Sequence, residues 1–209
     1  MYDREMKSPA ARDLAAFVLA GGKSTRMGSD KAFIEYEGRT LVARTLELAH
    51  AISSDVYIVG GRDKFAVLAA VVEDKFHDCG PLGGIHAALR SSSRDLNLML
   101  AVDMPFVSEV FLRYLIEEAR GAPGASVIVP RRDGRWQPLC AVYRREFADD
   151  AEAALVAGRN RIDLLFNGPR IHTIEEKETR LAGFVGDMFF NLNTPGDLET
   201  VPQAQPKED

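Results

Sequence analysis

The sequence contains little cysteine, and its cysteines are not spaced as in a disulfide framework or a metal site. Cys79 and Cys140 are the only two among 209 residues, and neither belongs to a CxxC pair. Zinc ribbons, iron–sulfur clusters and disulfide-built folds need closely spaced cysteines, so the sequence argues against these classes. A reduced, cytoplasmic protein is the expected default for such a chain.

Long runs of one charge and long apolar runs are also missing. Lys and Arg number 26 against 31 Asp and Glu, for a formal net charge of −5, and the two signs are mixed along the chain. This pattern argues against a nucleic-acid coat or a basic membrane tether. The longest early apolar run, Leu14 to Ala20, is too short to span a bilayer. We therefore expect no nucleic-acid or membrane partner, and any anionic ligand must meet a local group of cations.

Strand and helix patterns alternate along the first part of the chain. Apolar runs typical of strands buried in a sheet lie at 14–20, 55–59, 71–72 and 96–102. Helical patterns lie between and after them at 41–52, 65–70, 82–89 and 110–120. Because the connections are short, the alternation predicts an α/β fold with a mostly parallel sheet and right-handed crossovers.

The pattern changes beyond residue 124. Strands at 125–129 and 139–143 flank a polar turn, Arg131 to Arg135, which indicates a hairpin and hence an antiparallel insertion. Later elements are expected as helices at 146–157 and 160–166, a strand at 170–174, and a last helix capped by Thr194. Segments 1–12 and 202–209 carry no apolar period and are expected to be flexible tails, which leaves a single domain over 13–201.

A glycine-rich segment follows the first expected strand. Residues 19–31 read LAGGKSTRMGSDK and carry three cations, Lys23, Arg26 and Lys31. Backbone N–H groups at glycine, together with cations, are what a polyphosphate needs. A P-loop would need glycine where Phe17 stands, and two adjacent glycines do not fit the dinucleotide-binding pattern. A solvated turn with scattered charges is the alternative.

Asp103 comes directly after the expected strand 96–102 and is followed by Met104-Pro105. A carboxylate there suits Mg²⁺ bound to phosphate, since Mg²⁺ takes hard oxygen ligands and usually only one or two protein carboxylates. The alternative is a carboxylate that only caps the next turn.

Three other groups of residues could line a binding site. Asp74 and the GPLGG segment at 80–84 could bring a carboxylate and backbone amides to a nucleobase or ribose, although a Gly-Pro turn is often only a turn. Asn191 and Asn193 lie where a strand becomes a helix, a position at which such residues are often caps. Trp136 could form a pocket wall or pack within a strand.

Together these segments resemble the molybdenum cofactor guanylyltransferase family, within the nucleotidyltransferases. The resemblance covers most of residues 14–200 and rests on LAGGKSTRMGSDK at 19–31, GPLGG at 80–84, VDMP at 102–105 and NLNTP at 191–195. It implies a three-layer, Rossmann-like sandwich. It also implies a Mg²⁺-dependent enzyme that transfers GMP from GTP to the phosphate of molybdenum-bound molybdopterin and releases pyrophosphate.

The resemblance further implies which residues act. Catalysis would depend on Arg26, Lys31 and Asp103, with Asp103 as the metal ligand. Those that would bind GTP are Leu19, Ala20, Gly21, Gly22, Lys31, Gly61, Asp74, Gly80, Pro81, Leu82 and Asp103. Asn191 and Asn193 would lie on the acceptor side. Many relatives carry Asn after the second strand where this chain has Gly60-Gly61-Arg62, so a contact there would come from the backbone.

The implied reaction joins two anions, so positioning of phosphates and neutralisation of charge dominate, and no general base is required. The same fold acting as a molybdopterin cytidylyltransferase or a sugar-1-phosphate nucleotidyltransferase is one alternative. A noncatalytic nucleotide-binding partner that delivers the cofactor is another. Implied protein partners are molybdenum insertion proteins and the chaperones of molybdoenzymes.

Overall fold

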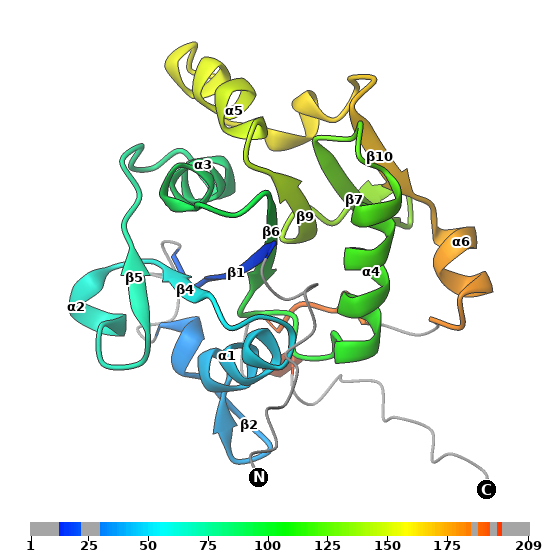
Figure 1. The fold of residues 1–209 in the computed structure, drawn as a ribbon. Helices are drawn as coiled ribbons and strands as arrows, with labels where there is room; N and C mark the ends of the chain where they lie inside the picture. The colour runs from blue at the N-terminus through cyan, green and yellow to red at the C-terminus, as the bar shows by residue number, and fades with distance from the viewer. Residues whose placement is uncertain (1–12, 22–29, 185–187, 193–195, 198–209) are drawn as a thin grey trace, which may run out of the picture.

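One mixed sheet runs through the molecule, with helices on both of its faces (Figure 1). The computed structural model describes residues 13–21, 30–184, 188–192 and 196–197. The strands of the sheet are β1 (Leu14–Leu19), β4 (Val56–Val59), β5 (Ala70–Val72), β6 (Leu96–Ala101), β7 (Val127–Arg132), β8 (Arg135–Trp136), β9 (Cys140–Arg144) and β10 (Ile171–Ile174). Their order is β10-β7-β9-β6-β1-β4-β5, with β8 paired to β7.

The sheet is parallel apart from its insertion. β1 lies inside the sheet and pairs in parallel with β4 and β6, so that Val18 faces Ile58 on one side and Leu100 on the other. β9 runs antiparallel to both of its neighbours, β6 and β7, and β8 runs antiparallel to β7. Because β6 and β7 both oppose β9, they point the same way and end at the same edge. The predicted α/β fold with an antiparallel insertion is confirmed.

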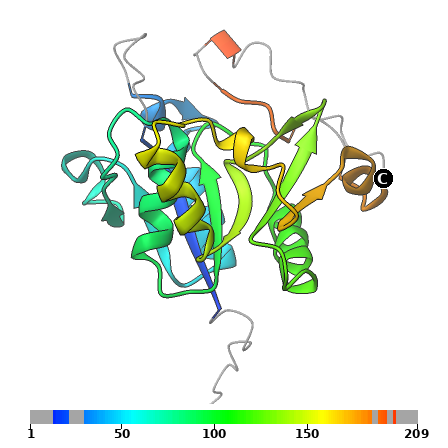
Figure 2. The ribbon, with the colours of Figure 1, turned by 90° about the horizontal axis from the view of Figure 1, so that it is seen from above.

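The helices divide between the two faces of the sheet (Figure 2). The α-helices are α1 (Leu41–Ile52), α2 (Arg62–Phe65), α3 (Pro81–Ser91), α4 (Glu109–Gly121), α5 (Phe147–Val156) and α6 (Glu176–Leu181). Alternate β1 side chains enter different cores: Leu14, Ala16 and Val18 pack with α1 and α4, whereas Ala15 and Phe17 pack with α3 and α5. A strand covered on both faces explains why its sequence is apolar without interruption.

Some local expectations were wrong. The helix expected at 65–70 is instead α2, which ends at Phe65. Phe65 is fully buried and stacks on Phe33, but Val67 and Leu68 are 92% and 43% exposed, so this apolar run has no single inward face. Residues 160–166 form only a short 3-10 helix, η4 (Ile162–Leu165).

Two elements of the structure were not predicted, and three predicted segments lie outside the described residues. Helix α6 and the small hairpin of β2 (Glu35–Tyr36) and β3 (Arg39–Thr40) were not predicted from the sequence. The helix expected at Thr194 and both expected tails, 1–12 and 202–209, lie outside the described residues.

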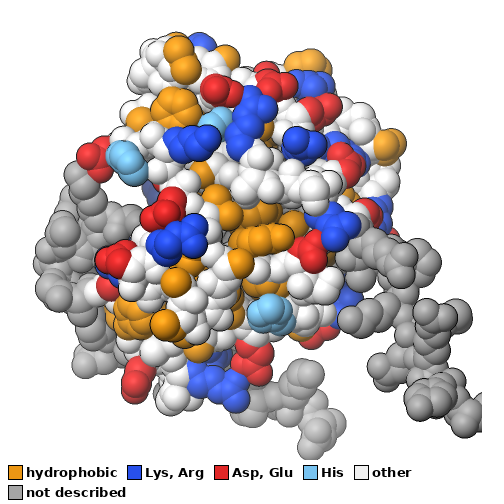
Figure 3. All heavy atoms as spheres, turned by 60° about the vertical axis from the view of Figure 1, so that its left-hand side comes forward, with side chains coloured by type: hydrophobic (Ala, Val, Ile, Leu, Met, Phe, Trp, Pro, Cys, Tyr) orange, Lys and Arg blue, Asp and Glu red, His pale blue; other side chains and the backbone are white. Residues whose placement is uncertain are grey.

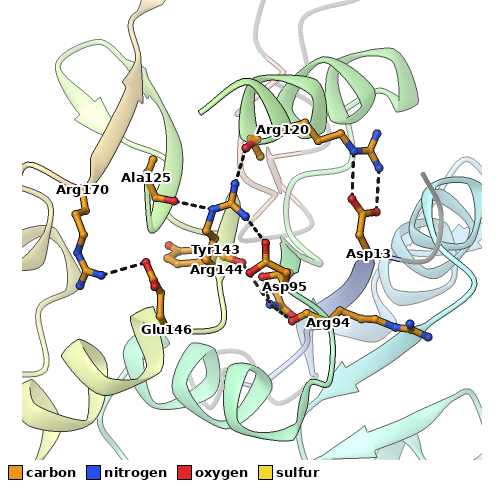
Figure 4. A network of polar contacts seen from close by, with 11 residues as sticks. Asp13, Arg94, Asp95, Arg120, Ala125, Tyr143, Arg144, Glu146 and Arg170 are labelled. Carbon is orange, nitrogen blue, oxygen red and sulfur yellow. Dashed lines mark hydrogen bonds and ion pairs between the residues drawn. The ribbon is translucent and has the colours of Figure 1, made fainter. Parts of the chain in front are cut away.

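The edge where the parallel strands begin is closed by a network of ion pairs and hydrogen bonds (Figure 4). Arg144, at the end of the antiparallel β9, donates to the carbonyl oxygens of Ala119 and Ala125 at 2.9 Å and pairs with Asp95. Arg120 pairs with Asp13 at 3.1 Å, just before β1. These contacts join β1, β6, β7, β9 and α4, and they leave the opposite edge of the sheet for a ligand.

The surface of the described residues fits the mixed charge of the sequence. On the face that carries α2, β5 and α3, Lys and Arg side chains are interspersed with Asp and Glu side chains (Figure 3). This face therefore presents no broad field of one sign. Within the described ranges, no helix is long and apolar enough to cross a membrane.

Candidate active site

The candidate residues gather at the edge where the parallel strands end. Gly21 follows β1, Gly61 follows β4, Asp74 follows β5 and Asp103 follows β6. Four loops that are dispersed in sequence therefore meet at one edge of the sheet, which is where open α/β sheets bind their ligands.

Lys31 and Asp103 are brought together at this edge. The Lys31 Nζ atom lies 4.0 Å from Asp103 Oδ2, and both side chains are partly exposed. Burial raises the pKa of the Asp103 carboxyl, and the nearby Lys31 ammonium acts in the opposite direction. A partly desolvated carboxylate beside a cation is a site that a second cation or a phosphate can enter.

A contact that the sequence did not reveal holds the turn carrying Lys31. This residue opens a 3-10 helix, η3 (Lys31–Phe33), which Asp30 caps by accepting the Ala32 N–H at 3.2 Å. The second oxygen of Asp30 accepts from Lys64 Nζ at 2.9 Å. Lys64 belongs to α2, so the contact ties the loop after β4 to the loop after β1.

The main chain just after β1 is already engaged. The N–H groups of Ala20 and Gly21 both donate to the Val59 carbonyl, at 3.0 and 3.1 Å, and the Leu19 carbonyl accepts the Val102 N–H at 3.3 Å. Any main-chain contact of Ala20 and Gly21 with a nucleotide would therefore use their carbonyl oxygens. Gly22 and Arg26, the other expected residues of this loop, lie outside the described residues.

The GPLGG segment is the first turn of α3 rather than a free loop. Gly80 has φ +65° and precedes the helix, Pro81 is its first residue, and the Leu82 side chain is fully buried. A Cβ on Gly83 would lie 2.4 Å from Asp74 Oδ2. The glycine therefore permits the close approach of α3 to the segment after β5.

Asp74 braces this approach. Its Oδ1 accepts the Phe76 N–H at 2.8 Å, and burial raises the pKa of its carboxyl. Gly61, by contrast, is exposed and directly precedes α2 as its N-cap residue. Asp74 thus has a structural contact that sequence analysis did not assign to it, in addition to its place at the ligand edge.

A cavity of about 700 Å³ opens beside Asp103. It is lined by residues 103–104, 132–133, 135–139 and 189–191. The Leu192 N–H donates to the Asp103 carbonyl at 2.8 Å, which brings Asn191 to the cavity. Asn193 lies outside the described residues. Of the residues expected to bind GTP, only Asp103 lines this cavity within the described part of the chain.

The cavity contains residues that sequence analysis missed. Trp136 lines the cavity, in agreement with its interpretation as a pocket wall. Four other lining residues were not identified from the sequence: Arg132, Arg135, Phe189 and Phe190. The sequence signal was the pair of arginines on either side of an Asp-Gly turn. It was interpreted only as a hairpin because nothing in the sequence places that hairpin beside Asp103.

The side chains at this edge suit one Mg²⁺ ion that is held mainly by oxygens of a bound phosphate and of water. Among the described residues, no group of three or more His, Cys, Asp or Glu side chains could hold a metal by itself. Asp103 offers a single hard oxygen ligand beside an open cavity. Mg²⁺ commonly takes one or two protein carboxylates and completes its shell with phosphate oxygens and water. The chemistry of Asp103 therefore suits this ion.

The matching family model and the sequence relatives indicate one family. The model of the MobA-like NTP transferase domain matches residues 16–169. A probable molybdenum cofactor guanylyltransferase of Pelotomaculum thermopropionicum is 34% identical over 183 residues, covering 87% of this chain and 88% of that protein.

Solved structures resemble the fold closely. The structure of molybdopterin-guanine dinucleotide biosynthesis protein A from Archaeoglobus fulgidus has a TM-score of 0.74 and 28% identity, and the match covers 89% of this chain and 95% of that one. The 2-C-methyl-D-erythritol 4-phosphate cytidylyltransferase of Thermus thermophilus has a TM-score of 0.61 at 17% identity over 88% of this chain and 95% of that one. The second similarity concerns the fold alone.

Proposed function

The chain belongs to the MobA-like NTP transferase family, and from this premise we propose that it is a molybdenum cofactor guanylyltransferase. The reaction transfers GMP from GTP to the phosphate of molybdenum-bound molybdopterin. An oxygen of the acceptor phosphate forms a bond to the α-phosphorus of GTP. The bond from that phosphorus to the β-phosphate oxygen breaks, and pyrophosphate leaves with the bonding electrons.

The observation that carries this proposal is the pairing of Lys31 with Asp103, a residue that lines the cavity. Transfer between two phosphates needs charge neutralisation more than proton transfer, because the acceptor oxygen is already an anion near neutral pH. Lys31 supplies a fixed positive charge for the phosphate oxygens as negative charge builds on the leaving group. Arg26 is the second proposed phosphate cation.

Asp103 would hold Mg²⁺ together with oxygens of the nucleotide phosphates. When bound, the ion neutralises phosphate charge and helps to align the two reacting groups. The position of Asp103 would determine where the ion lies. Asp103 follows a buried strand, and its backbone carbonyl accepts a hydrogen bond from the Leu192 N–H.

The nucleotide is proposed to bind along the loops after β1, β4 and β5 and the first turn of α3. The first N–H groups of a helix have no acceptor within it, and in α3 these belong to Gly80, Leu82 and Gly83. Such groups suit guanine or phosphate oxygens. The proposed GTP-binding residues are Leu19, Ala20, Gly21, Gly22, Lys31, Gly61, Asp74, Gly80, Pro81, Leu82 and Asp103.

The acceptor is proposed to enter from the side of Asn191 and Asn193. Asn191 and Asp103 line one cavity, so a phosphate held there would lie next to the metal ligand. We also propose a cytoplasmic enzyme that hands its product to molybdenum insertion proteins or to the chaperones of molybdoenzymes.

Pyrophosphate release tests this function. The protein is incubated with Mg²⁺ and each of GTP, CTP and ATP, with and without molybdopterin. Release with GTP that requires molybdopterin supports the proposal. Equal or greater release with CTP would instead identify a cytidylyltransferase, and release that ignores molybdopterin would exclude it as the acceptor.

A further inference from the structure

The hairpin at the rim of the cavity places two arginines opposite each other. Asp133 and Gly134 form its turn, with φ +48° and +72°, and the ladder pairs Arg132 with Arg135 directly. An Asp-Gly turn of this kind fixes the register of the hairpin. Residues that face each other across a ladder project to the same side, and like charges in such a pair destabilise the hairpin.

Carboxylates compensate only one member of this pair. Arg132 Nε lies 3.5 Å from Asp133 Oδ2 and 3.5 Å from Glu176 Oε1. No carboxylate of the described residues forms an ion pair with Arg135. Arg135 therefore keeps a positive charge at the cavity that no carboxylate of the described residues pairs with, whereas Arg132 is already compensated.

The hairpin is also held in place from α6. The Asp133 N–H donates to Glu176 Oε2 at 3.1 Å, and Arg180 donates to Glu176 Oε1 at 3.0 Å one turn further along the helix. Glu176 thus fixes the turn and faces Arg132 at the same time. A cation whose position is set before binding loses less freedom when a ligand arrives.

The arginines share their cavity with the reacting edge of the sheet. β7 runs in the same direction as β6, so Arg132, at the end of β7, lies at the edge of the sheet that carries Asp103. Arg132, Arg135 and Asp103 all line one cavity. The Arg131 guanidinium lies over the Trp136 ring, 5.1 Å from its centroid. Arg131 therefore covers one face of the ring, and Trp136 lines the cavity.

We propose that Arg132 and Arg135 bind the phosphate of the acceptor molecule. This inference rests on the proposed function, which makes that acceptor molybdopterin. A phosphate bound by both arginines would replace their mutual repulsion with two charge-assisted hydrogen bonds. The arginines line the cavity with Asn191, whereas the proposed guanine-binding turn of α3 does not line it. This lining places the arginines on the side proposed for the acceptor and away from the proposed guanine site.

The only tryptophan of the chain makes this site observable without turnover. Trp136 lines the cavity, so its fluorescence can report binding there. Wild type, Arg135→Gln and the Arg132→Gln/Arg135→Gln double variant are titrated with molybdopterin, with and without a nonhydrolysable GTP analogue. Arg161→Gln is the matched control, since Arg161 is 72% exposed, pairs only with Asp163 among the described residues, and does not line the cavity.

We expect the dissociation constant for molybdopterin to rise about tenfold or more in Arg135→Gln, and further in the double variant. Binding of the GTP analogue and the melting temperature should stay near wild-type values, and Arg161→Gln should bind normally. Wild-type affinity for molybdopterin in the double variant, or no binding to any form of the protein, would overturn the assignment. So would an effect confined to GTP or pyrophosphate, since the arginines would then serve the triphosphate.

The proposed function can fail separately. If molybdopterin binds in an arginine-dependent way but no nucleotide releases pyrophosphate, the acceptor site stands and the transferase activity does not. If GTP turnover requires molybdopterin but ignores both arginines at limiting acceptor, the activity stands and this assignment falls.

Discussion

Lys31 Nζ and Asp103 Oδ2 lie 4.0 Å apart, at the outer limit of an ion pair. The two residues come from different loops, one after β1 and one after β6, and neither side chain is fully buried. A contact this loose contributes little to stability. It leaves both charges able to meet a ligand, which is why the first two predictions concern these residues.

Asp103→Asn should abolish most turnover while leaving the fold intact. The change keeps the shape of the side chain but removes the carboxylate that would hold Mg²⁺, and we expect kcat to fall by about 100-fold or more. Because burial disfavours the charged carboxyl, the melting temperature should not fall. Pyrophosphate release and thermal denaturation measure the two effects. Asp163→Asn, which removes a surface carboxylate paired with Arg161, is the control, and near-normal activity of Asp103→Asn would reject the metal-ligand role.

Lys31→Met should lower kcat more than it raises the KM for GTP. The negative charge on the departing pyrophosphate is greater in the transition state than in bound GTP, so a cation aimed at it acts mainly on the rate. We expect kcat to fall by about 100-fold and KM to rise by less than about tenfold. Lys177→Met removes the same charge from an exposed position of α6. Equal losses in the two variants at fixed ionic strength would mean that Lys31 only attracts anions in a diffuse way.

Much of the fold could be predicted because its signals are local. The uninterrupted apolar sequence of β1 reflects burial on both faces, and Thr40, which accepts the Ala43 N–H, marks the start of α1. The end of α2 could not be predicted in this way. Phe65 is buried and stacks on Phe33, which lies far away in sequence, whereas Val67 is exposed.

Residues of the candidate site could be predicted where they directly follow a strand that is recognisable in the sequence. Asp103 follows a buried strand, so its place at the ligand edge follows from the parallel sheet. Arg132 and Arg135 reach the same cavity because β7 runs in the same direction as β6, with the antiparallel β9 between them in the sheet. Lys64 bonds Asp30 across two loops. Such contacts depend on tertiary arrangement, which residue spacing does not encode.

GTP should bind more tightly than CTP or ATP. Backbone N–H groups at the start of α3 and the Asp74 carboxylate are proposed to recognise guanine. A site built to form hydrogen bonds with one base rejects another that lacks a partner, on the order of 10⁴-fold in favourable cases. Isothermal titration with each nucleotide and Mg²⁺ measures this preference, and a flat profile would refute guanine specificity.

Gly83→Ala should destabilise the protein and disturb the site together. A new Cβ would lie 2.4 Å from Asp74 Oδ2 and 2.8 Å from the Phe76 carbonyl, so α3 or the segment after β5 must move. We expect the free energy of unfolding to fall by about 1–3 kcal/mol. Gly124→Ala is the control, because a Cβ there meets nothing within 4 Å. Chemical denaturation compares the two, and equal stability would mean that the approach of α3 to Asp74 is looser than the structure has it.

Asp74→Asn should change how stability depends on pH. Burial is the largest influence on the Asp74 carboxyl and raises its pKa, against the opposing effects of the Phe76 N–H and of His77 and His86. The folded protein then binds this proton more tightly than the unfolded chain does. The proton on Asp74 therefore stabilises the folded protein below the pKa of the unfolded chain, about 4. This stabilisation is lost as the pH rises through the higher pKa of the folded protein.

The asparagine variant stays neutral at every pH and keeps an oxygen that can accept the Phe76 N–H. Its melting temperature should therefore gain on that of wild type as the pH rises through this window, and the difference should level off above it. Asp163→Asn should show the opposite trend, because Arg161 lowers the pKa of Asp163 and the lost ion pair matters only where the carboxylate is charged. Melting curves across the acidic range compare the variants. A constant difference between Asp74→Asn and wild type would show that Asp74 titrates alike in the folded and unfolded chain.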